Sequence, residues 1–90
     1  MPHAMLVKIR VKPGRSDDAL KGLNEEVVPM VKNAPGFLRG TWFGDDQSGH
    51  GLVVFASEAE ARQAASMVSA GPDDPVEIES ATVYQVNAEA

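Results

Sequence analysis

The chain has 90 residues, of which 43% are hydrophobic and 23% are charged, and it contains no cysteine. These values indicate one small globular domain and exclude disulfides, thiol catalysis and thiolate metal sites. A formal net charge of −5 disfavours nucleic acid as a partner, because a phosphate backbone attracts a positive surface. No apolar run is long enough to span a bilayer and the opening MPHAM lacks a secretion signal, so we expect a cytoplasmic protein without a membrane partner.

The first predicted element is a strand over residues 5–12, MLVKIRVK, in which alternate side chains point to opposite faces. Residues 1–4 are interpreted as an N-terminal extension or a cloning remnant without a structural role. The single domain is therefore expected to cover residues 5–90.

A helix is predicted to follow, because Ser16, Asp17 and Asp18 supply an N-cap oxygen and two negative charges at its start. Its apolar stripe, at spacings of three and four residues, consists of Leu20, Leu23, Val27, Met30 and Val31. Pro29 is expected to kink this helix or tighten its last turns, since proline lacks an N–H and crowds the carbonyl four residues earlier. The helix is expected to end within residues 33–36.

A β-hairpin is predicted next, with FLRGTWFG (37–44) and HGLVVFA (50–56) as strands around the polar turn DDQSG (45–49). Ser57 and Glu60 then form the S-x-x-E pattern, in which each side chain satisfies a backbone donor at a helix start. The inner face of this second helix carries small side chains: Ala61, Ala64, Ala65 and Val68.

The last strand is predicted over residues 76–87, with polar Ser80 marking a candidate β-bulge. The order strand, helix, strand, strand, helix, strand predicts an α+β fold of ferredoxin-like topology. Its sheet is expected to be antiparallel, with both helices on one face.

The opposite face of the sheet is expected to carry no helix. Lys8 and Arg10 are expected there as cross-strand ion pairs with Glu77 and Glu79. The rest of that face is expected to be apolar: Leu6, Val53, Phe55 and Val83. Because such a face is rarely left to water, we expect a second copy of the chain to cover it in a homodimer.

Three segments, KPGRSDDAL (12–20), VVPMVKNAPGFL (27–38) and VVFASEAEA (53–61), resemble the antibiotic biosynthesis monooxygenase (ABM) family, and the resemblance extends over residues 5–87. It implies a homodimer whose two sheets close into a dimeric α/β barrel, with a ligand cleft between the sheet and the helices of each subunit. It also implies a cofactor-independent, monooxygenase-like protein that binds a small hydrophobic or aromatic ligand.

The chain departs from this family at the family's functional positions. Where heme-degrading members carry an asparagine, a tryptophan and a histidine, this chain has Val7, Ala56 and no histidine on its second helix. Without that iron ligand heme degradation is not expected, and no cofactor is predicted. The quinone-forming members carry an asparagine and a tryptophan where this chain offers Val53 or Val54 and Ala56. No catalytic residue is therefore assigned, and a non-catalytic ligand-binding or assembly protein on the same barrel is the alternative.

The candidate ligand-binding residues are those expected to line the cleft: Val7, Leu23, Val27, Trp42, Val54 and Ala56. Trp42 has two interpretations. It packs in the core or at the dimer face, as large aromatic side chains usually do, or it forms a stacking wall for a flat ligand. Gly40 and Gly44 leave space beside its indole, and a ligand or a cross-strand side chain must fill that space.

The candidate polar contacts are Arg39, His50 and Tyr84. Arg39 is expected to form an ion pair on the sheet rather than to bind a substrate carboxylate. His50 shares one turn with Asp45 and Asp46, but polar hairpin turns are normally solvated, so no metal site is predicted.

Overall fold

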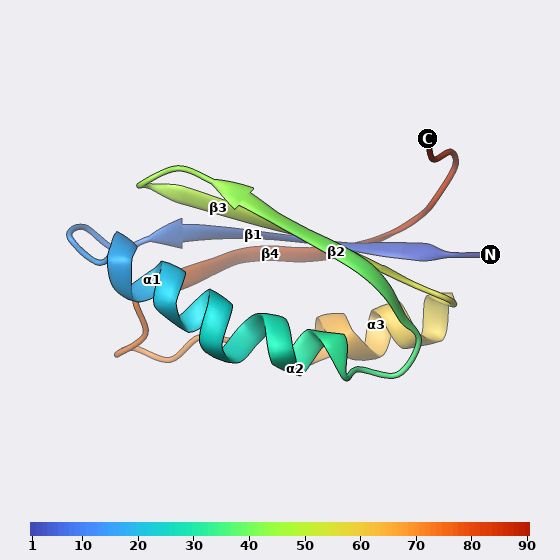
Figure 1. Ribbon diagram of the computed structural model, residues 1–90, viewed down its shortest axis with the longest axis horizontal. Helices are drawn as coiled ribbons and strands as arrows, with labels where there is room; N and C mark the ends of the chain where they lie inside the picture. The colour runs from blue at the N-terminus through green and yellow to red at the C-terminus, as the bar shows by residue number, and fades with distance from the viewer.

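The fold is described from a computed structural model of residues 1–90. One antiparallel sheet has the strand order β2-β3-β1-β4, and the helices lie on one side of it (Figure 1). The strands are β1 (His3–Val11), β2 (Phe37–Gly44), β3 (Ser48–Phe55) and β4 (Val76–Gln85). The predicted α+β class and order of elements are confirmed, and the topology is compatible with a ferredoxin-like fold.

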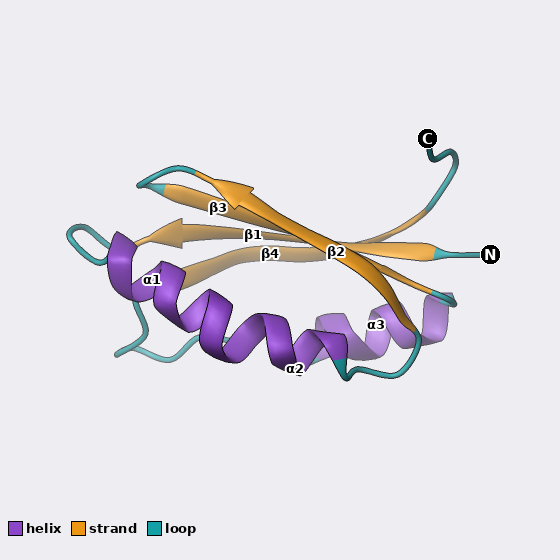
Figure 2. Ribbon diagram, viewed as in Figure 1, coloured by secondary structure: helices purple, strands orange, loops and turns teal.

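The first helix comprises α1 (Ser16–Gly22), the π-helical segment η1 (Leu23–Val27) and α2 (Val28–Lys32), which follow one continuous path (Figure 2). Pro29 is the second residue after the π-helical segment, and the N–H of Val28 donates to the carbonyl of Leu23. The predicted tightening of the last turns is seen after Pro29, where the N–H groups of Asn33 and Ala34 donate to the carbonyls of Met30 and Val31 at 3.2 and 3.0 Å. The turn before Pro29, by contrast, is wider than an α-helical turn. A wider turn moves the carbonyls away from the proline ring.

Strand β1 begins earlier than the sequence predicts. His3 pairs with Phe55 and Gln85, Ala4 is buried, and the carbonyl of Pro2 accepts a hydrogen bond of 3.1 Å from the N–H of Val86. The interpretation of residues 1–4 as having no structural role is therefore corrected: His3 and Ala4 belong to the sheet.

The core lies between the sheet and the helices and centres on Met5, Val53, Phe55 and Ala61. Val53 and Phe55 were expected on the face without helices, and so was Val83, which packs against this core. The correction has a simple cause. Residues 52–55 are all apolar, so their pattern does not show which side each occupies, and only the pairing of Met5 with Val53 does.

The face without helices, here called the open face, therefore carries Leu52 and Val54 instead. Arg10 forms the predicted ion pair with Glu77 on this face, at 2.5 Å. Lys8 lies opposite Ser80 rather than Glu79, because the register shifts between Lys8 and Ile9. The shift leaves Glu79 without a partner on β1. The β-bulge therefore lies at Glu79, next to Ser80, where it was predicted.

The second helix, α3 (Glu58–Ser66), begins as its sequence predicts. The hydroxyl of Ser57 accepts a hydrogen bond from the N–H of Glu60 at 3.3 Å and donates one to the Glu60 carboxylate at 2.9 Å. Ala61 is fully buried against the sheet. None of the helices combines the length and the apolar character that a bilayer crossing requires.

Candidate functional site

The helix-facing side of β2 and β3 is built largely from glycine. Register and alternation place four glycines there, and we call them the glycine floor: Gly40, Gly44, Gly49 and Gly51. Because these residues lack side chains, neighbouring side chains can lie directly on the backbone of the sheet. Such a surface lets a flat group approach the sheet closely.

The indole of Trp42 lies over this floor. A Cβ atom added at Gly51 would lie 2.7 Å from Trp42 Nε1, and one added at Gly40 would lie 2.8 Å from Trp42 Cη2. The side chain of Ile9 similarly covers Gly49, at 3.0 Å. Trp42 also packs against the core yet remains partly accessible. The glycines thus hold the indole flat on the sheet and leave part of it free.

The first helix stands on the same side of the sheet without burying any of its own residues. Its apolar side chains Leu20 and Met30 are 58% and 63% exposed, and Leu23 is only half-buried. The π-helical segment lies in the middle of this helix, and such segments are frequent at functional sites. An uncovered apolar stripe on the helix side of the sheet is suited to contact an apolar ligand.

The predicted ligand-binding residues fall into two groups. Trp42 and Val7 share one row, because both pair with Gly51, and Leu23 and Val27 come from the first helix on the same side. Val54 is on the open face, where the strand alternation turns it away from Trp42. Ala56 lies beyond the end of β3 and is exposed.

The three predicted polar contacts lie away from Trp42. Register places Arg39, His50 and Tyr84 on the open face, and for Arg39 this agrees with the expected ion pair on the sheet. Arg39 forms an ion pair with Glu89, and Tyr84 is exposed. Strand alternation is the reason, since each pairs with a residue that points away from the helices.

His50 has a distinct environment on the open face. Its ring stacks on Phe43, with centroids 5.1 Å apart and planes 8° from parallel. Its Nδ1 is buried without a hydrogen-bond partner. Across the strands, His50 lies opposite Lys8.

In the hairpin turn, backbone N–H groups stabilise the negative charge of the Asp45 carboxylate. Asp45 accepts hydrogen bonds of 2.8 Å from the N–H groups of Gln47 and Ser48, and these bonds lower the pKa of its carboxyl. No group of three or more histidine, aspartate or glutamate side chains lies close enough together to hold a metal ion. The turn is thus organised by its own backbone.

Gly40 and Gly44 were expected beside the indole, whereas the role of their counterparts Gly49 and Gly51 was not predicted. A signal was present, because a G-x-G pair on one strand of a hairpin faces a glycine-rich partner strand. The π-helical segment was also missed. The proline at position 29 indicated a disturbance there but not its kind.

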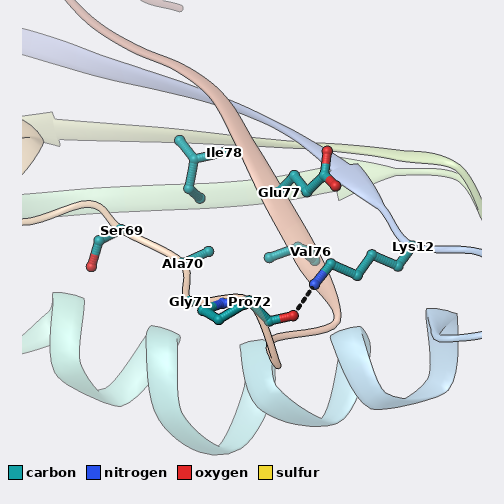
Figure 3. Close-up of a pocket in the computed structure, with 8 residues that line it drawn as sticks. All are labelled: Lys12, Ser69, Ala70, Gly71, Pro72, Val76, Glu77 and Ile78. Atoms are coloured by element: carbon teal, nitrogen blue, oxygen red, sulfur yellow. Dashed lines mark hydrogen bonds between the residues drawn. The ribbon is translucent and has the colours of Figure 1, made fainter.

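Two shallow hollows lie elsewhere, along β4. One of about 440 Å³ is lined by Lys12, Ser69, Ala70, Gly71, Pro72, Val76, Glu77 and Ile78 (Figure 3). Lys12 crosses it and donates a hydrogen bond of 2.6 Å from Nζ to the carbonyl of Pro72. The other, of about 420 Å³, lies between α3 and β4. Neither contains Trp42 or any residue of the glycine floor.

Comparison with protein-family models, with curated proteins and with solved structures found no match for this chain.

Proposed function

We propose that the protein binds a small, flat, apolar molecule between the first helix and the sheet, against Trp42. The observation that supports this proposal is the indole, which lies flat over Gly40 and Gly51 and remains partly accessible. The neighbouring side chains Val7 and Ile9 are apolar and only partly buried, and so is Leu23 on the first helix. Apolar and aromatic linings are typical of sites for small organic ligands.

Oxygenation of the bound molecule is the second candidate function. The apolar surroundings of Trp42 favour it, because they would shield a reactive substrate anion from water. Against it, none of Val7, Ile9, Leu23 and Trp42 is an acid or base that could remove a phenol proton. We therefore place binding before catalysis.

We also propose that the protein is a homodimer joined through its open faces. The chain exposes 5968 Å², whereas a monomeric protein of 9.6 kDa exposes about 5,100 Å². The excess of roughly 900 Å² is close to the area of about 800 Å² that each partner buries in a standard interface. Phe43 and Leu52, which are 54% and 41% exposed on the open face, would become covered.

A titration with 1,5-dihydroxynaphthalene, a flat phenol, tests the binding proposal. Trp42 is the only tryptophan, so its emission reports on this site alone. We expect saturable quenching, matched by calorimetric heats, in the wild type and in the open-face variant Leu52→Ala. Trp42→Ala should weaken the calorimetric affinity about tenfold, since aromatic contacts contribute ~1 kcal/mol beyond their buried area. Equal affinities in all three proteins would overturn the proposal. Oxygen consumption in the same mixture separates oxygenation from binding.

A further inference from the structure

The indole nitrogen of Trp42 is a hydrogen-bond donor without a partner in the chain. None of the side-chain hydrogen bonds starts from Trp42 Nε1. The one buried side-chain nitrogen or oxygen that lacks a partner is His50 Nδ1. Since Trp42 Nε1 also lacks a partner but is not buried, this donor must be accessible from outside the chain.

The donor lies over an inner strand of the sheet. A Cβ atom added at Gly51 would lie 2.7 Å from Trp42 Nε1 and 2.9 Å from its Cδ1. One added at Gly40 would lie 2.8 Å from Cη2 and 3.0 Å from Cζ3. The pyrrole edge of the indole, which carries the N–H, is therefore next to Gly51 on β3, and the benzene edge is next to Gly40 on β2.

The neighbouring side chains of the sheet offer this donor no acceptor. Val7 pairs with Gly51 from β1, Ile9 covers Gly49, and Phe37 would lie 3.6 Å from a Cβ atom added at Gly40. All three side chains are hydrocarbons, so the N–H is the one polar side-chain group among them.

A ligand made only of carbon and hydrogen would leave this donor unsatisfied. The accessible N–H can bind water, and a flat ring against the indole would exclude that water. A donor that loses its water without gaining an acceptor costs more free energy than a new hydrogen bond normally gains. A ligand with an oxygen atom at its edge replaces the water and avoids this loss.

We infer that the ligand of this site is a flat molecule with a neutral carbonyl oxygen at its edge, as in a ketone or quinone, and that Trp42 Nε1 donates a hydrogen bond to this oxygen. The inference rests on the proposed binding of a flat molecule against Trp42. A carboxylate is disfavoured, because Lys8 and Arg10 of β1 lie on the open face and a charge without a partner loses its hydration. Trp42 thereby separates oxygen-bearing rings from hydrocarbons of the same shape.

Titrations with 1-indanone and indane test the inference. The two probes share one fused-ring skeleton, and only 1-indanone has a keto oxygen. Ligand-observed NMR measures both affinities in proteins with or without tryptophan. Trp42→Phe keeps an aromatic face and removes the N–H, so it should weaken 1-indanone about two- to tenfold more than indane. Tyr84→Phe removes an exposed donor from the open face and should leave the ratio of the two Kd values unchanged.

The wild type gives a second readout that needs no variant. Trp42 is the only tryptophan, so the protein has one indole N–H resonance. At saturation this resonance should lie further downfield with 1-indanone than with indane, because a hydrogen bond to oxygen deshields the proton. If Trp42→Phe does not fold, this resonance alone decides.

Two sets of results separate this inference from the proposed function. Equal losses of affinity for both probes in Trp42→Phe, with equal shifts of the indole resonance, would overturn the hydrogen bond and leave the binding site in place. If neither probe binds the wild type, or if both bind Trp42→Phe as tightly as the wild type, the proposed site fails and the inference fails with it.

Discussion

At the scale of single residues, Trp42 and Gly51 depend on each other, and their contact gives the first prediction. Gly51→Ala places a methyl group 2.7 Å from the indole nitrogen, so the indole must move. We expect a loss of about 1–3 kcal/mol in the free energy of unfolding, measured with urea, and a shift in tryptophan emission.

Gly22→Ala is the matched control, since nothing lies within 4 Å of the added methyl group. Gly22 is at the end of α1, where alanine should stabilise by about 0.5–1 kcal/mol. Equal unfolding free energies for the two variants would show that the indole does not rest on Gly51.

A second residue-scale prediction concerns acid. The hydrogen bonds to Asp45 lower its pKa, and ion pairs with Arg62 and Arg10 lower those of Glu58 and Glu77. A carboxyl whose pKa is lower in the folded than in the unfolded state stabilises the fold above its unfolded pKa. That contribution is lost as the pH falls through the folded pKa.

Stability should therefore decline below about pH 4, and Asp45→Ala should decline less steeply there because one such group is gone. Denaturant unfolding at a series of pH values measures both slopes. Asp46→Ala removes a neighbour that accepts none of these hydrogen bonds, so it should keep the slope of the wild type. An Asp45→Ala slope as steep as that of the wild type would contradict the assignment.

At the scale of elements, local signals in the sequence predict well and non-local ones do not. The cap of α3 was predicted because Ser57 and Glu60 interact within one turn. The sides of β3 were not, because residues 52–55 are apolar on both faces and only pairing with β1 decides their orientation. The same error moved Val54 into the candidate site.

The first helix gives the element-scale prediction, through Pro29. Alanine at this position regains the missing N–H and allows an α-helical turn in place of the π-helical one. Proline inside a helix costs up to ~3 kcal/mol relative to alanine, so Pro29→Ala should raise the melting temperature. It should also weaken binding of 1,5-dihydroxynaphthalene, because Leu23 and Val27 would turn about the helix axis.

Pro35→Ala is the control for this change. Pro35 follows the helix in an exposed turn, where proline restricts the unfolded chain. Its loss should leave the melting temperature unchanged or lower it slightly, with unchanged ligand affinity. A melting temperature for Pro29→Ala no higher than that of Pro35→Ala would show that the wider turn already accommodates the ring at little cost.

At the scale of the whole molecule, the small core and the large surface have one origin. Only eight of the 90 residues are buried, because the first helix buries none and the open face has no helix over it. The sequence predicted this two-sided architecture from its alternation of elements. It placed Trp42 within the candidate site, but it could not predict that Arg39 pairs with Glu89, because the two residues are far apart in the sequence.

A chain with so small a core should draw stability from association, and this gives the last prediction. Binding that favours the folded state makes the melting temperature depend on concentration. Over about a hundredfold rise in protein concentration, the wild type should therefore melt at progressively higher temperature. Leu52→Lys places a charge on the open face and should give a lower melting temperature that does not vary with concentration. Met67→Lys, an equal change at an exposed position just after α3, should retain the dependence. A wild-type melting temperature that stays constant over the same range would mean that the open face is stable in water.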